Sequence, residues 1–128
     1  MNHCLDPEVV IQIDREHVAV TGEPHEVVNR NGLLGALGRP LATFDGYEVF
    51  PTVVQRVGAL LDGLAQAHPF RQGNKRTAWD PAITYLGTCG MGVEASDDDA
   101  TEFVLGVVVH EFDAHQAAVW FADRVVFL

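Results

Sequence analysis

The 128-residue chain is poor in basic side chains, cysteines and long apolar runs. It has 8 Lys and Arg residues against 18 Asp and Glu residues, which gives a formal charge of −10 with neutral histidines. Such acidity disfavours direct binding to nucleic acid or to an anionic membrane, because both require a basic face. Two cysteines, Cys4 and Cys89, are too few for a disulfide framework or a cysteine-rich metal site, so we expect reduced thiols.

No segment predicts a membrane span or a targeting signal. The longest apolar run, residues 103–109, is far shorter than the ~18 residues that cross a bilayer. The N-terminus lacks a basic start followed by an apolar stretch. With 48% hydrophobic residues, the chain can bury a substantial core as one domain over residues 1–128. We therefore expect a soluble, cytoplasmic protein.

Helix signals recur along the chain, and strand signals are scarce. Asp6 and Pro7 predict the start of a helix that ends near Val20, and a shorter helix is expected over 32–37. The clearest helical face begins after Pro51 or Thr52. It consists of Val53, Val54, Val57, Leu60, Leu61, Leu64 and Ala65.

Three further helices complete the expected fold. One follows the loop at 68–73 and runs towards Cys89, with a kink or irregularity expected at Pro81. Another begins after Ser96, and the last begins after Asp113 and extends its apolar face to Val125. The sequence therefore predicts an all-α bundle of about six helices.

Residues 41–50 interrupt the helical pattern. The turn signal Asp45-Gly46 is surrounded by Phe44, Tyr47 and Phe50, which predicts an aromatic loop or a short hairpin flap. These aromatic side chains either form a docking surface for another protein or complete a small core. Both interpretations fit the pattern.

Carboxylates are absent from one stretch of this acidic chain. The seventeen residues between Asp62 and Asp80 contain none, yet they hold Arg71, Lys75 and Arg76, and Lys75 is the only lysine. The stretch indicates either a local anion site or a basic helix start that packs against an acidic face.

Segment 68–76, HPFRQGNKR, has the composition of an anion-binding turn. Gly73 permits a positive φ or a close backbone approach, and the N–H groups of residues 74–76 would point out of a new helix. Basic side chains are unfavourable at a helix start unless an anion compensates them. His68 could act as a general base or simply cap the preceding helix, and Phe70 is the expected core anchor.

This segment resembles the Fic motif, His-Pro-Phe-x-[Asp/Glu]-Gly-Asn-[Gly/Lys]-Arg, and Lys75 with Thr77-Ala78 is similar to its Doc (death-on-curing) branch. The likeness extends to the residues at 31–40 and 50–52 and to the C-terminal helices. It implies a compact Fic/Doc-type helical domain. It also implies that His68 removes the proton of a target hydroxyl, that Phe70 anchors the loop and that Arg76 balances phosphate charge during transfer. The residues matched to the nucleotide phosphate loop are Gly73, Asn74, Lys75 and Arg76.

The resemblance also bears on the reaction. Fic proteins usually transfer AMP from ATP, whereas Doc toxins transfer the terminal phosphate of ATP to a threonine of elongation factor Tu. Lys75 stands where AMP-transferring members have glycine, and Trp79 stands where they commonly have a second arginine. Both differences favour phosphate transfer, with AMP transfer as the less favoured alternative.

One position departs from the motif. Gln72 replaces the carboxylate that binds Mg²⁺, and a neutral amide is a weaker ligand for this hard cation. A non-catalytic homologue that binds an antitoxin or nucleotide is therefore the second hypothesis.

The expected partner follows from a missing segment. Self-inhibited Fic proteins carry a [Ser/Thr]-x-x-x-Glu-[Gly/Asn] helix, and no Ser or Thr here has Glu four positions later. The resemblance then implies inhibition by a Phd-like antitoxin. The flap around Phe44, Tyr47 and Phe50 is the candidate surface for the antitoxin or the target.

Overall fold

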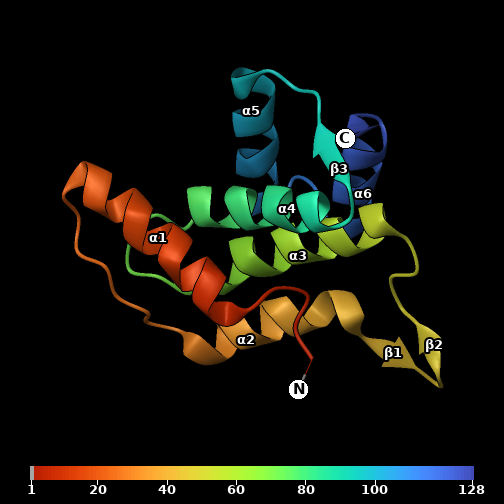
Figure 1. The fold of residues 1–128 in the computed structure, drawn as a ribbon, viewed down its shortest axis with the longest axis horizontal. Helices are drawn as coiled ribbons and strands as arrows, with labels where there is room; N and C mark the ends of the chain where they lie inside the picture. Colours follow the sequence, from red (N-terminus) through yellow and green to blue (C-terminus); the bar gives the residue numbers. More distant parts are fainter. Residues whose placement is uncertain (1) are drawn as a thin grey trace.

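The computed structural model describes residues 2–128, and six α-helices form most of it (Figure 1). The all-α class and the number of helices expected from the sequence are confirmed. The helices are α1 (Pro7–Thr21), α2 (Arg30–Gly38), α3 (Val53–Ala67), α4 (Arg76–Thr88), α5 (Asp97–Val108) and α6 (Ala114–Ala122). A 3₁₀ turn, η1 (Arg39–Leu41), follows α2.

Helix α3 lies at the centre of the fold and contacts α2, α4, α5 and α6. The predicted apolar face is largely confirmed, since the buried residues of α3 are Val57, Gly58, Ala59, Leu60, Leu61, Leu64 and Ala65. At Gly58, a Cβ atom would lie 2.8 Å from the carbonyl oxygen of Ala114, so the backbone of α6 rests directly on α3. This close packing requires glycine at that position.

Side-chain caps fix where the helices begin. Asp6, Ser96 and Asp113 each accept a backbone N–H from the first turn of the helix that follows, as expected. Helix α2 begins two residues earlier than predicted, because the side chain of Asn29 accepts from the N–H of Gly32. The predicted helix start signals are therefore genuine, and one further cap was missed.

Pro81 does not interrupt α4, which is assigned as one helix from Arg76 to Thr88. The expectation of an irregularity at this position is not met in the secondary structure. Pro81 is the sixth residue of the helix and is buried, so the helix loses a single N–H near its start and retains its packing.

A hairpin forms between α2 and α3, as predicted. Strands β1 (Thr43–Phe44) and β2 (Tyr47–Glu48) are antiparallel, and the turn residues Asp45 and Gly46 both have positive φ. Phe44 and Tyr47 lie opposite each other and are 74% and 76% exposed. The interpretation in which these aromatics complete a core is therefore wrong for this pair, whereas Phe50 is half-buried.

A second strand pair was not predicted. Strand β3 (Met91–Val93) pairs antiparallel with β4 (Val125–Phe127). Val125 was expected on the last helix, but α6 ends at Ala122. Two consecutive β-branched residues, Val125 and Val126, favour extended backbone when a partner strand is available.

The structure also bears on membrane spans and on the two cysteines. No helix within residues 2–128 is both long and apolar enough to span a bilayer. Cys4 and Cys89 are free thiols. Burial raises the pKa of the Cys4 thiol to about 11, so this thiol stays protonated at neutral pH and is a poor nucleophile.

Candidate active site

Segment 68–76 forms the loop between α3 and α4, at the end of the molecule where α1 crosses α4 (Figure 1). His68 ends α3 with φ +44° and ψ +58°, in the left-handed region that is uncommon for residues other than glycine. Its side chain is exposed, and no hydrogen bond of its ring is found within residues 2–128. His68 is therefore the C-cap residue of α3, and its imidazole is exposed to solvent.

Two residues hold the inside of this loop. The Phe70 N–H donates to Asn74 Oδ1 at 3.0 Å, and Asn74 Nδ2 donates to the Phe70 carbonyl at 2.6 Å. The Phe70 ring is buried, as expected for the anchor. Both bonds use the Asn74 amide, so this side chain helps to close the loop.

The backbone of the loop presents a run of unsatisfied donors. The N–H groups of Phe70 and Arg71 have acceptors, and the Thr77 N–H donates to the Gly73 carbonyl at 2.9 Å. For the five N–H groups of residues 72–76, no acceptor is found in the part of the chain that the structure describes. Consecutive free N–H groups at a helix start form an anion-binding site.

The basic side chains of the loop also favour an anion. Lys75 and Arg76 are exposed, and neither forms an ion pair within residues 2–128. Arg71 lies 3.7 Å from Glu26, and both side chains are exposed, so this contact is weak. The interpretation in which the basic helix start is neutralised by an acidic face is not supported by ion pairs at Lys75 or Arg76.

An open cleft of about 710 Å³ lies between the start of α4 and one face of α5. Its volume is within the range of small-molecule sites. It is lined by Lys75, Arg76, Trp79, Asp80, Asp97, Ala100, Thr101, Val104 and Leu105. Lys75 and Arg76 supply positive charge, Asp80 of α4 and Asp97 of α5 supply carboxylates, and most of the remaining lining residues are apolar. The arrangement suits a ligand with an anionic end and a flat apolar part.

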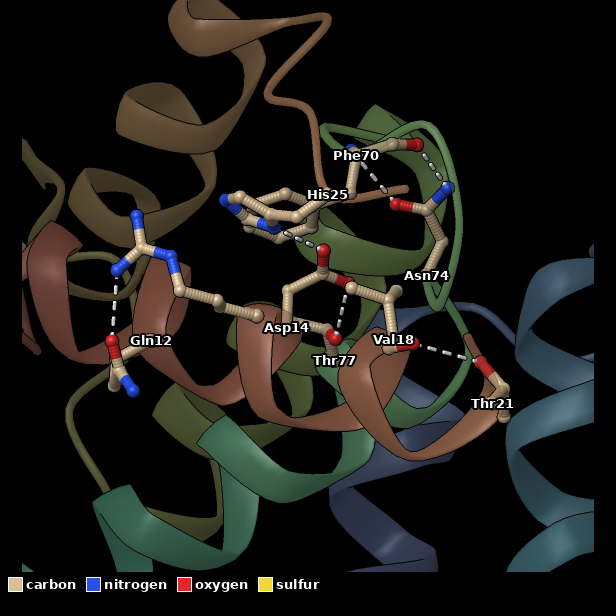
Figure 2. A network of polar contacts seen from close by, with 9 residues as sticks. Gln12, Asp14, Val18, Thr21, His25, Phe70, Asn74 and Thr77 are labelled. Carbon is tan, nitrogen blue, oxygen red and sulfur yellow. Dashed lines mark hydrogen bonds and ion pairs between the residues drawn. The ribbon is translucent and has the colours of Figure 1, made fainter. Parts of the chain in front are cut away.

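A buried carboxylate under the loop was not predicted from the sequence. Asp14 of α1 is fully buried and accepts a hydrogen bond from Thr77 Oγ1 at 2.9 Å (Figure 2). Gly73 has φ +82°, and a Cβ atom there would lie 2.6 Å from Asp14 Oδ1. Glycine is thus required at this position for both of the reasons that the sequence suggested.

The extended segment between α1 and α2 runs beside the loop. The N–H groups of Val28 and Asn29 donate to the Pro69 carbonyl, and the Arg71 N–H donates to the Glu26 carbonyl. Nothing in the sequence of this segment indicated a strand-like partner for the motif. These three backbone bonds fix the position of the loop relative to residues 25–29.

The donor set of the loop suits phosphate but does not suit a resident metal ion. No group of three or more His, Cys, Asp or Glu side chains that could hold a metal occurs in residues 2–128. Gln72 is half-buried and neutral. Glu26 is exposed and lies beside Arg71. Asp14 is fully buried under the loop, and its two oxygens already contact Thr77 and His25. We therefore assign no step to a protein-bound metal.

The hairpin lies away from the loop. It precedes α3, whereas His68 follows α3, and Figure 1 shows the two at opposite ends of this helix. A helix of fifteen residues is about 22 Å long. Phe44, Tyr47 and Phe50 therefore do not line the 68–76 loop.

Comparison with known proteins agrees with this geometry. Residues 4–86 match the family model described as the Fic/DOC family. The chain is also 38% identical, over 91 residues, to the protein named Toxin Doc of Mycolicibacterium smegmatis (strain ATCC 700084 / mc(2)155). This match covers 67% of the present chain and 70% of that protein. The matched segment of the family model includes α1, the loop and most of α4.

Replacing Gly73 by alanine tests the packing under the loop. We expect Gly73→Ala to lower the free energy of unfolding by about 2–4 kcal/mol, because it adds backbone strain to a clash with a buried carboxylate. Urea denaturation measures the change. Gly46→Ala is the matched control: Gly46 has φ +81° with nothing within 4 Å of its Cβ position, so it should cost only about 1 kcal/mol. Equal losses for the two variants would show that the contact with Asp14 is unimportant.

Proposed function

Since the chain belongs to the Fic/DOC family, we propose that it is the toxin of a toxin–antitoxin system and transfers the terminal phosphate of ATP to a protein hydroxyl. The observation that carries this proposal is the run of five unsatisfied N–H groups at residues 72–76, next to the unpaired cations Lys75 and Arg76. From the resemblance of the motif to the Doc branch, the proposed acceptor is a threonine of a translation factor such as elongation factor Tu, and the proposed location is the cytoplasm.

The proposed reaction uses the groups that the loop exposes. Neutral His68 takes the proton from the target hydroxyl, and the oxygen attacks the γ-phosphorus. The bond from that phosphorus to the bridging oxygen breaks, and ADP leaves. The free N–H groups of 72–76, with Lys75 and Arg76, offset the negative charge that builds up on the transferring phosphate.

Two residues support transfer of the terminal phosphate rather than AMP. Lys75 places the chain's only lysine at the phosphate loop, where AMP-transferring relatives have glycine. Trp79 lines the cleft on α4 in place of the second arginine of those relatives. We propose that the nucleotide base and ribose occupy the cleft beside Trp79, with the phosphates over the loop.

Labelled ATP tests both the reaction and the base. Purified protein with γ-labelled ATP should label elongation factor Tu, and α-labelled ATP should not. His68→Ala should reduce the rate by at least about 10²-fold, because the general base is lost. His110→Ala is the control, since His110 is also exposed and also left-handed, at φ +65°. Label from the α-phosphate would instead indicate AMP transfer.

The second candidate function is a non-catalytic homologue, and Gln72 is the observation that favours it. In this case the loop would still bind nucleotide, or the protein would still bind its antitoxin, without turnover. Restoring the carboxylate separates the two candidates. We expect Gln72→Asp to raise phosphate transfer at least about tenfold when Mg²⁺ is present, because Mg²⁺ prefers carboxylate ligands.

Gln72→Asn is the control for this substitution, since it has the size of aspartate without its charge. A large gain from a silent wild-type chain, seen with Asp and not with Asn, would mean that the natural protein is catalytically impaired. No gain would show that the wild-type loop does not need the carboxylate.

We further propose that the hairpin binds a Phd-like antitoxin. Phe44 and Tyr47 form an exposed aromatic pair, and aromatic residues dominate the binding energy of protein interfaces. The hairpin stands at the opposite end of α3 from His68, which favours an inhibitor over a target that must present its hydroxyl at the loop.

Replacing both aromatics should weaken the antitoxin complex. We expect Phe44→Ser with Tyr47→Ser to raise the Kd for the antitoxin encoded beside this chain by at least about 30-fold. Titration calorimetry measures the Kd, and thermal unfolding should change little because both side chains are exposed. Val20→Ser on α1, which is also highly exposed, is the control. An unchanged Kd would exclude the hairpin as the antitoxin surface.

A further inference from the structure

We propose that Asp14 is a positioning residue for the phosphate loop, acting from inside the protein through Thr77 and Gly73. The inference rests on the proposed function of the loop as a phosphate site. Asp14 lies far from the motif in sequence, and neither its own pattern nor the motif predicts the contact.

The contacts of Asp14 join three separate segments. Its Oδ1 accepts from Thr77 Oγ1 of α4 at 2.9 Å, and its Oδ2 lies 3.0 Å from His25 Nδ1 in the segment after α1 (Figure 2). The His25 ring in turn packs near the Phe70 ring, with 6.0 Å between centroids. One carboxylate of α1 therefore contacts both the start of α4 and the segment that runs beside the loop.

Because Asp14 is buried, it must keep its hydrogen-bond partners. Asp14 is 0% exposed and Thr77 is 2% exposed, and they are the only buried polar residues within 2–128. A buried carboxylate is costly unless it is hydrogen-bonded, so its partners are held in place. The other polar contact between α1 and α4, from His17 to Asp80, is partly exposed to solvent and constrains less.

The geometry shows how the carboxylate acts on the loop. Asp14 holds the Thr77 hydroxyl, and the Thr77 N–H holds the Gly73 carbonyl at 2.9 Å. Gly73 itself leaves no room for a Cβ atom above Asp14. Both ends of the turn at 73–77 are thus fixed by contacts with the protein interior, and its N–H groups at 73–76 have no acceptor within residues 2–128. Asp14 does not reach the ligand, so its role is to position.

Substitutions at Thr77 test this role without removing the buried charge. Thr77→Val keeps the shape and loses the hydroxyl, whereas Thr77→Ser keeps the hydroxyl. Thr84→Val is the matched control, because the Thr84 hydroxyl donates to the Asp80 carbonyl of the same helix and is exposed. Asp14→Asn is a fourth variant, to be used if it folds.

Two measurements are made on each variant. The first is hydrogen exchange at the amides of Phe70, Arg71 and Thr77, each of which donates a hydrogen bond at the loop. We expect exchange there to become about tenfold faster in Thr77→Val, while the amides of α3 stay unchanged. The second is phosphate transfer, in which the KM for ATP should rise about tenfold while kcat changes less than about threefold.

Thr77→Ser should restore both values, and Thr84→Val should leave both unchanged. Wild-type exchange and KM in Thr77→Val would overturn the proposal, as would a uniform acceleration across all helices, which indicates general destabilisation. If the wild-type chain transfers no phosphate, the proposed function fails. The exchange measurement then decides the positioning role by itself.

Discussion

The burial of α3 is the constraint on which the rest of the molecule depends. Four of the other five helices contact this helix, and seven of its fifteen residues are buried. Because α3 is fixed along its length, the segments at its two ends are fixed as well. The hairpin precedes it and the 68–76 loop follows it, so α3 separates an exposed aromatic surface from the candidate active site (Figure 1).

The loop divides its residues between inner support and outer chemistry. Phe70 is buried in the core, and the side chain of Asn74 is used to close the loop. Gly73 packs closely against the buried carboxylate of Asp14, which supports the turn from the protein interior. The groups left without a partner in the protein are the backbone N–H groups of residues 72–76. The side chains of His68, Lys75 and Arg76 are exposed beside them. The donors that the loop offers thus come mainly from its backbone, and they do not depend on the residue at position 72.

Local signals in the sequence predicted the elements well. The spacing of apolar residues predicted α3, and capping residues predicted the starts of α1, α5 and α6. The turn signal Asp45-Gly46 predicted the hairpin. Each of these signals acts within a few residues. The loop was also predicted, since its cations and glycine are adjacent in the chain. Asn74 was expected in the phosphate loop, but nothing in the sequence indicated that its side-chain amide makes two hydrogen bonds to the backbone of Phe70.

Features that depend on distant contacts were missed. Asp14 looks like any polar residue on an amphipathic helix, and only its contact with Thr77, 63 positions away, shows that it is buried. The pairing of residues 26–29 with the loop, the β3–β4 pair and the position of the hairpin relative to His68 are also tertiary facts. The local effect of Pro81 predicts an irregular helix, whereas α4 is continuous and buries this proline.

The central proposal is that the backbone N–H groups of residues 72–76 bind phosphate. An NMR titration of the labelled chain with ATP tests it most directly, because every backbone N–H reports separately. We predict that the largest shifts occur at the amides of 72–76, accompanied by the indole N–H of Trp79 in the adjoining cleft. Saturable shifts confined to another part of the molecule, with the amides of 72–76 unchanged, would contradict the proposal.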